Sequence, residues 1–181
     1  LRSFSAPVKL TSDLSNEEYF YLMKFDDDPF SRWSAGQNLM KRALIARSSY
    51  RAETQLEKSL VKAFSFLLDE LHDKDPLLLA TIITIPGFPE LESLQRTCDP
   101  LAIYESQVFL EKFIGLELSN KLSRCLEAFH QESLKSWPEG QGSRKMLSLS
   151  WRYLSMSGDK QIRQEMIKVV NSKSMTLARS A

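Results

Sequence analysis

The side chains best suited to metal chemistry in this 181-residue chain are two histidines, His72 and His130. A hydrolytic zinc site needs two histidines one helical turn apart and a carboxylate, as in H-E-x-x-H, because all three groups must reach one metal ion. Here the histidines lie 58 positions apart, and neither belongs to that pattern. We therefore interpret both as surface or helix-end residues.

The two cysteines, Cys98 and Cys125, are the second source of reactivity. Two cysteines make neither a disulfide framework nor a four-ligand zinc site, so we expect buried free thiols in a reducing compartment. Cys125 precedes His130 by five positions, which places the pair off a common helix face and disfavours nucleophilic catalysis. The chain also lacks G-x-S-x-G, G-x-x-x-x-G-K-[ST] and G-x-G-x-x-G loops. We predict no catalytic, cofactor-binding or metal-ligating residue in this chain.

A run of three carboxylates at positions 26–28 precedes Pro29, Arg32 and Trp33. The run lacks the glycine and the spaced ligands of a calcium loop, so capping of the next helix is the simpler interpretation. For Arg32 and Trp33 we expect a cation–π contact or a structural salt bridge, with substrate contact as the alternative.

The charge of the chain is balanced overall, with 24 basic and 23 acidic residues, but it is uneven along the sequence. The segment from Arg144 to the end holds eight basic and two acidic residues, which leaves 16 basic and 21 acidic residues before it. We interpret this segment as a basic helical edge, although a nucleic-acid-binding face between Arg144 and Arg179 is an alternative that predicts salt-sensitive affinity. The longest apolar run, Leu77 to Ile85, is too short to span a membrane, and no signal peptide pattern is present. We therefore expect a cytoplasmic protein that binds neither nucleic acid nor membrane.

Most of the chain has the pattern of short helices. Ser15 and Glu18 form a capping box that predicts a helix over about 15–26. Three Asp-Pro pairs each precede an apolar run, and they predict helices that start at Pro29, Pro76 and Pro100. Further helices are expected after Pro89 and over about 54–70, 143–156 and 159–170.

Glycines and prolines predict where these helices end. The Pro100 segment should run to about Ser133, with Gly115 as a candidate break, and Gly158 is a candidate C-cap. The spacing of the Asp-Pro pairs hints at helices laid down at a repeating interval, as in stacked helix-pair architectures. We therefore predict an all-α fold of stacked antiparallel helices.

The first residues have a different pattern. Phe4, Ala6, Val8 and Leu10 alternate with small or polar residues, which predicts a short β-strand over about 1–12. A lone strand has no pairing partner in a helical chain, so we interpret it as the last strand of a preceding domain. The chain also begins without an initiator methionine, which suggests that it is a piece of a longer polypeptide, with processing of the N-terminus as the alternative.

Two segments are similar to those of one enzyme family. Leu1–Val8 resembles the L-R-x-F-S-A-P-V segment of bacterial-type aminopeptidase N, and Phe30–Gln37 resembles its F-x-R-W-x-A-x-Q segment. Looser similarities follow at Asp99-Pro100, at Arg144–Ser155 and at Asn171–Thr176, where the sequence departs from the family pattern at Ser174 and Leu177.

The resemblance implies a place for this chain within a zinc metallo-aminopeptidase of the gluzincin type. Residues 1–12 would end a β-sandwich domain. Residues 13–181 would form the N-terminal half of a helical C-terminal domain, a superhelical stack of antiparallel helices that caps the active-site chamber. The zinc ligands of the parent enzyme would lie upstream, so this piece alone would be inactive and would hold no zinc. Its partners would be the catalytic and β-sandwich domains of the same enzyme and, for the parent, peptide substrates.

The alternative is a free-standing helical-repeat scaffold that binds a protein partner in its concave face. A reading frame that starts close to Leu1, with no H-E-x-x-H upstream, would favour this alternative.

Overall fold

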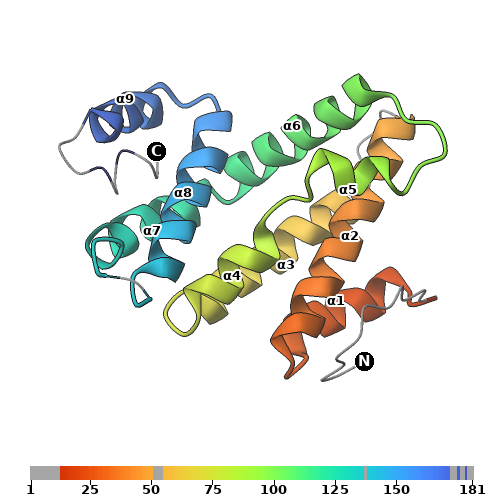
Figure 1. The fold of residues 1–181 in the computed structure, drawn as a ribbon, viewed down its shortest axis with the longest axis horizontal. Coiled ribbons are helices and arrows are strands. Elements are labelled where there is room, and N and C mark those ends of the chain that lie inside the picture. The colour runs from red at the N-terminus through yellow and green to blue at the C-terminus, as the bar shows by residue number, and fades with distance from the viewer. Residues whose placement is uncertain (1–12, 51–54, 137, 172–174, 176–177, 179–181) are drawn as a thin grey trace.

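The computed structural model describes residues 13–50, 55–136, 138–171, 175 and 178. The described residues form helices without a strand, which confirms the all-α prediction (Figure 1). The strand predicted at 1–12 lies outside the described residues, and the domain boundary after residue 12 stays a prediction. The helices are α1 (Asn16–Phe25), α2 (Pro29–Tyr50), α3 (Gln55–Leu71), α4 (Pro76–Ile83), α5 (Phe88–Glu92), α6 (Pro100–Glu117), α7 (Ser119–Glu132), α8 (Gln141–Met156) and α9 (Lys160–Val170).

The predicted capping box opens α1. The backbone amide of Glu18 donates to the Ser15 hydroxyl at 3.2 Å, and the Ser15 amide donates to the Glu18 carboxylate at 2.8 Å. These bonds, led by the one from the Ser15 backbone, lower the pKa of Glu18. Two amides that would lack partners at a helix start are thereby satisfied.

Each of the three Asp-Pro pairs starts a helix, as predicted. Asp28, Asp75 and Asp99 each accept a hydrogen bond from the backbone amide three residues later, at 2.9–3.2 Å. Proline follows at the first helical position, where its missing amide proton costs nothing. The sequence therefore marks the starts of α2, α4 and α6 through local chemistry.

The predicted helix break at Gly115 is wrong by three residues. Gly115 lies inside α6, and the chain turns at Leu118, which separates α6 from α7. A Cβ atom at position 115 would lie 2.0 Å from the carbonyl oxygen of Tyr153 on α8. Position 115 therefore requires glycine because the backbones of α6 and α8 touch there. The conformational freedom of glycine plays no part, since Gly115 lies inside a regular helix.

The start of α8 was also misplaced. The helix begins at Gln141, two residues before the predicted start at 143, and Gly142 is buried within its first turn. A Cβ atom at Gly142 would lie 2.8 Å from the backbone nitrogen of Leu77. At Gly142, as at Gly115, the absence of a side chain allows two helices to pack closely.

Gly158 has a φ of +86°, which agrees with its predicted role after the end of α8.

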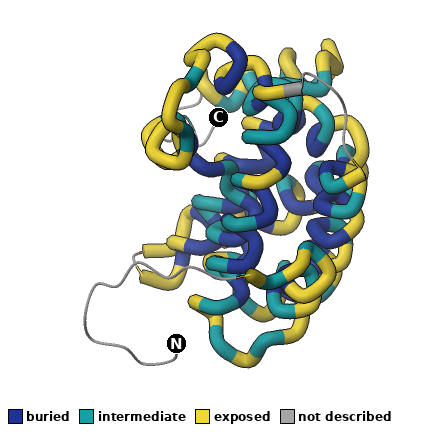
Figure 2. The backbone as a smooth tube through the Cα atoms, turned by 90° about the vertical axis from the view of Figure 1, so that its right-hand side faces the viewer, coloured by how far each residue is buried: buried dark blue, intermediate teal, exposed yellow. Residues whose placement is uncertain are grey.

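Two helices, α2 and α8, organise the packing. The helix α2 contacts α1, α3, α4, α5 and α6, while α8 contacts α4, α6, α7 and α9. Because α4 and α6 touch both of these helices, one continuous apolar core joins the two ends of the molecule. Buried residues run through its middle, and exposed residues lie on the outer turns (Figure 2). Most of the apolar run from Leu77 to Ile85 lies in α4. None of the described helices is both long and apolar enough to cross a membrane.

A second, smaller apolar cluster holds α9. Leu147 and Trp151 of α8 are buried there, packed against partly buried side chains that include Ile162, Met166 and Val169 of α9. None of the residues of α9 is itself buried. This helix is therefore attached along one edge, at the end of the molecule opposite α1 (Figure 1).

Replacing Ser150 by alanine should stabilise the chain. The Ser150 hydroxyl lies fully buried in α8, and no residue in the described part of the chain gives it a hydrogen-bond partner. Ser150→Ala removes this unsatisfied group and favours the helix, so the free energy of unfolding should rise by about 1 kcal/mol. Urea unfolding followed by circular dichroism measures the change.

Ser106→Ala is the matched control. Ser106 is also buried, but its hydroxyl donates to the Ile103 carbonyl at 2.7 Å, so loss of this hydroxyl should destabilise the chain. Equal losses in the two variants would contradict the prediction.

Candidate functional site

The two histidines do not meet in the folded chain. His72 follows α3, where its Nε2 lies 2.9 Å from a carboxylate oxygen of Asp73 and its ring packs edge-on against Phe129. His130 lies in the last turn of α7. Among the residues that the structure describes, no three His, Cys, Asp or Glu side chains are arranged to hold a metal ion.

Cys125 and His72 line one cavity of about 260 Å³ between α3 and α7, together with Leu68, Asp69, Lys121 and Arg124. The sequence analysis considered His130 as a neighbour of Cys125, disfavoured that pair, and did not foresee His72 beside this thiol. Burial raises the pKa of the Cys125 thiol to about 11. The thiolate is the reactive form, so at neutral pH this thiol is a poor nucleophile.

The Cys125 thiol should make the stability of the chain depend on alkaline pH. Its folded pKa lies above the unfolded value of 9.0, so the unfolded state loses this proton first. Its contribution to stability is complete below pH 9 and is lost as the pH rises from 9 towards 11. The free energy of unfolding of the natural chain should therefore fall relative to that of Cys125→Ala over this range, as urea titrations at several pH values can show. Cys98→Ala is the control for loss of a thiol, and parallel curves for the natural chain and Cys125→Ala would contradict the prediction.

The carboxylate run before α2 is used in local structure. The Asp28 carboxylate accepts hydrogen bonds from both the amide and the hydroxyl of Ser31, at 2.9 and 2.8 Å. The Asp28 amide in turn donates to the Asp26 carboxylate at 2.8 Å. These bonds agree with the predicted capping role.

Arg32 makes a structural salt bridge, one of its two predicted roles. Its Nη2 donates to the Glu70 carboxylate of α3 at 2.9 Å, and its Nε donates to the Met23 carbonyl at 3.0 Å. Because Met23 lies in the last turn of α1, Arg32 satisfies a carbonyl that the helix leaves without a partner. The Trp33 ring instead lies 5.4 Å from that of Phe30. Arg32 thus joins three helices and is nearly buried.

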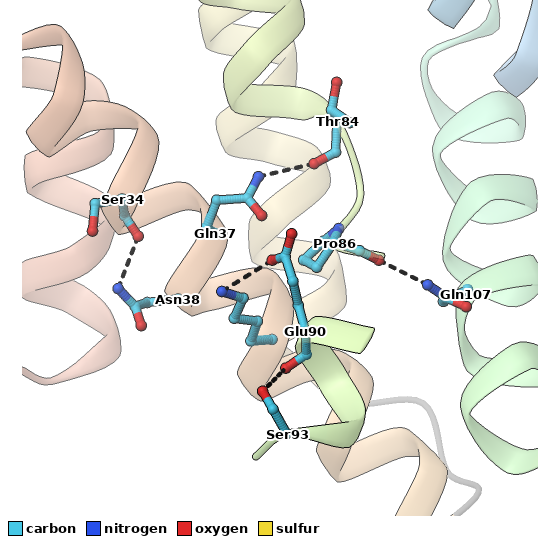
Figure 3. A network of polar contacts seen from close by, with 9 residues as sticks. Ser34, Gln37, Asn38, Thr84, Pro86, Glu90, Ser93 and Gln107 are labelled. Atoms are coloured by element: carbon cyan, nitrogen blue, oxygen red, sulfur yellow. Dashed lines mark hydrogen bonds and ion pairs between the residues drawn. The ribbon is translucent and has the colours of Figure 1, made fainter. Parts of the chain in front are cut away.

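Gln37, the last residue of the F-S-R-W-S-A-G-Q segment, holds the connection between α4 and α5. Its side-chain amide donates to the Thr84 carbonyl at 2.9 Å, and the Gln107 amide of α6 donates to the Pro86 carbonyl at 2.7 Å (Figure 3). Lys41 of α2 pairs with Glu90 of α5 at 3.1 Å on the same side. Side chains from α2 and α6 therefore satisfy the Thr84 and Pro86 carbonyls of this proline-rich connection.

Several cations of the basic C-terminal segment are engaged in the fold. Arg144 donates to the carbonyls of Ser133 and Lys135, and Lys145 donates to the Thr81 hydroxyl at 3.0 Å. Arg152 forms an ion pair with the buried carboxylate of Glu111. These contacts engage three of the eight basic residues of the segment in the fold, and both the basic edge and the nucleic-acid-binding alternative stay predictions.

Sequence reasoning missed a cluster around Arg47. The Arg47 side chain lies between α2, α3 and α6, where Nη1 contacts the carboxylate of Glu57 at 3.2 Å and the guanidinium carbon lies 3.0 Å from the ring centroid of Phe109. Glu57 is almost fully buried, although it opens an otherwise amphipathic helix. A charged residue at an inward position of that helix was the signal that could have revealed the cluster.

A family model described as "Domain of unknown function (DUF3458_C) ARM repeats" matches residues 16–181. Aminopeptidase N of Escherichia coli (strain K12) is 32% identical over 159 residues, which are 86% of this chain and 18% of that protein. Aminopeptidase N of Haemophilus influenzae is 28% identical over 158 residues, with the same coverage of each chain. Aminopeptidase N of Caulobacter vibrioides is 30% identical over 125 residues, which are 68% of this chain and 14% of that protein. The chain thus spans less than a fifth of the length of these relatives.

A solved structure has the same fold. The crystal structure of Legionella pneumophila aminopeptidase A in complex with aspartic acid superposes with a TM-score of 0.82, at 23% sequence identity. The superposition covers 99% of this chain and 22% of that chain. At 23% identity, this similarity shows the fold alone.

Proposed function

The chain belongs to the family described as DUF3458_C ARM repeats, and from this membership we propose that it serves as a non-catalytic helical region of a zinc aminopeptidase N. The resemblance to aminopeptidase N seen in the sequence is confirmed by the family model and by the curated relatives. The observation that carries the proposal is the 32% identity to an aminopeptidase N over 86% of this chain.

In the proposed role, the region acts by shape. Its helices continue a superhelical stack that covers the active-site chamber of the parent enzyme and limits the size of the peptides that enter. Its partners are the catalytic and β-sandwich domains of the same polypeptide, and the parent acts in the cytoplasm. The internal hydrogen bonds of Arg32 and Gln37 support a structural part for the motif, because both side chains join α2 to neighbouring segments.

Zinc belongs to the proposed parent enzyme, and the described residues of this chain do not fit it. His72 pairs with Asp73 and His130 lies in α7, and no three His, Cys, Asp or Glu side chains among the described residues are grouped to hold a metal ion. No chemical step is therefore assigned to these residues.

Metal analysis and a peptidase assay on the purified chain test the non-catalytic part of the proposal. We expect far less than one zinc ion per chain by plasma mass spectrometry and no hydrolysis of leucine p-nitroanilide. Stoichiometric zinc, or hydrolysis that a chelator abolishes, would overturn it.

The capping role is tested in the enzyme encoded by the complete reading frame. Two substrates share an N-terminal leucine: a short peptide, and a folded protein with an ordered N-terminus. We expect rapid release of leucine from the peptide and none from the folded protein until it is unfolded. Equal release from both would contradict a size-limiting cap. A reading frame without H-E-x-x-H would instead favour the free-standing scaffold.

A further inference from the structure

The Arg47 guanidinium is fixed in place by two contacts. One edge faces the Glu57 carboxylate, with Nη1 3.2 and 3.4 Å from its two oxygens, and one face stacks on the Phe109 ring at 3.0 Å. Only 16% of the Arg47 side chain and 1% of the Glu57 side chain are exposed. The planar group therefore loses little further freedom when it binds a ligand.

The remaining edge of this guanidinium is available. Nε and Nη2 of Arg47 form no hydrogen bond with the described residues. These two nitrogens form the parallel fork that binds a carboxylate through two hydrogen bonds. A nearly buried cation with a free fork is suited to a carboxylate ligand.

A cavity of about 250 Å³ adjoins Arg47 between α2 and α6. Its other lining residues are Ala102, Glu105, Ser106 and Phe109. Glu105 is exposed and forms no ion pair or hydrogen bond with the described residues, so its carboxylate is available too. The cavity thus combines a cation, an anion and an apolar wall.

This combination selects for a ligand that carries both charges. A simple anion would be repelled by Glu105, and a simple cation would be repelled by Arg47. The volume lies below the range of about 300–1,000 Å³ that is typical of drug-sized ligands, which favours a smaller molecule.

We propose that this cavity binds a free α-amino acid. Its carboxylate would accept hydrogen bonds from Nε and Nη2 of Arg47, and its ammonium group would pair with Glu105. Its side chain would lie against Phe109 and Ala102. Binding at this site does not require the proposed chamber-capping function, because all of the residues that line the cavity belong to this chain.

The test titrates the ¹⁵N-labelled chain with leucine and follows the backbone amide signals of residues 102–109 by NMR. Leucinamide lacks the carboxylate, and N-acetyl-leucine lacks the ammonium group. We expect saturable shifts with leucine and affinities at least tenfold weaker for both analogues. Absence of saturable shifts with leucine, or equal affinity for leucinamide, would overturn the proposal.

Substitutions of the two charged residues separate the two contacts. Glu105→Gln should weaken leucine binding about tenfold and strengthen N-acetyl-leucine binding, because the repulsion of its carboxylate is removed. Glu117→Gln on the same helix is the matched control, since Glu117 is also exposed but lies outside the cavity, and it should bind leucine as the natural chain does. Arg47→Lys should weaken leucine binding through loss of the two-nitrogen fork. If Arg47→Lys unfolds, Glu105→Gln still tests the proposal, because Glu105 is exposed and its replacement should not disturb the fold. Unchanged leucine affinity in Glu105→Gln would overturn the proposal.

Discussion

Gly115→Ala should lower the free energy of unfolding by about 3 kcal/mol, because the new methyl group has no room. Its Cβ atom would lie 2.0 Å from the carbonyl oxygen and 2.8 Å from the carbonyl carbon of Tyr153. Both atoms belong to the backbone of α8, so relief requires that α6 and α8 move apart. Tyr153 resists that movement, since its buried hydroxyl donates to the Ile83 carbonyl of α4 at 2.5 Å. Urea unfolding monitored by circular dichroism gives the free energy and the slope m.

Gly36→Ala is the control for this experiment. Gly36 also lies inside a helix against other elements, but its added Cβ atom would meet the side-chain atoms Cγ2 of Ile82 at 3.1 Å and Sδ of Met23 at 3.2 Å. Relief here needs shifts of a few tenths of an ångström in side-chain atoms, and alanine favours the helix by about 1 kcal/mol, so the two effects should nearly cancel. A loss below 1 kcal/mol in Gly115→Ala, or an equal loss in Gly36→Ala, would contradict the role of backbone contact at Gly115.

Local chemistry made the helix starts predictable from the sequence. Ser15, Asp28, Asp75 and Asp99 each act within three residues of themselves, so their partners can be read along the chain. The same holds for the turn at Gly158, where the residue type alone permits a φ of +86°. Capping and turn formation depend on few neighbours, and tertiary contacts here do not override them.

Contacts between distant segments were not predictable in the same way. Gly115 was interpreted as a candidate break, and the predicted helix over 143–156 left out Gly142, because the sequence does not show that Tyr153 and Leu77 lie against these glycines. The cavity beside Arg47 likewise depends on how α2 meets α6, and residues 47 and 105 are too far apart in the chain for spacing to reveal it. The resemblance to a family supplied the overall fold, but the placement of each side chain required the structure.

Arg32→Met should cost about 3 kcal/mol of stability, because it removes one buried and one partly buried hydrogen bond of a nearly buried cation. The Met23 carbonyl would lose the donor that completes the last turn of α1, and Glu70 would lose its ion-pair partner on α2. Methionine keeps most of the apolar stem of arginine, so the loss reports the polar contacts. Urea unfolding of the variant measures the change.

Two further variants identify the cause of the loss at Arg32. Arg32→Lys keeps the charge, but one ammonium group cannot reach both the Met23 carbonyl and Glu70 with the geometry of a planar fork, so about half of the loss should remain. Lys41→Met is the surface control: the pair of Lys41 with Glu90 is half exposed, and its loss should cost less than about 1 kcal/mol. If Arg32→Lys were as stable as the natural chain, charge alone would account for the contribution of Arg32. If Arg32→Met matched Lys41→Met, Arg32 would be an ordinary surface residue, and the junction of α1, α2 and α3 would depend on apolar packing instead.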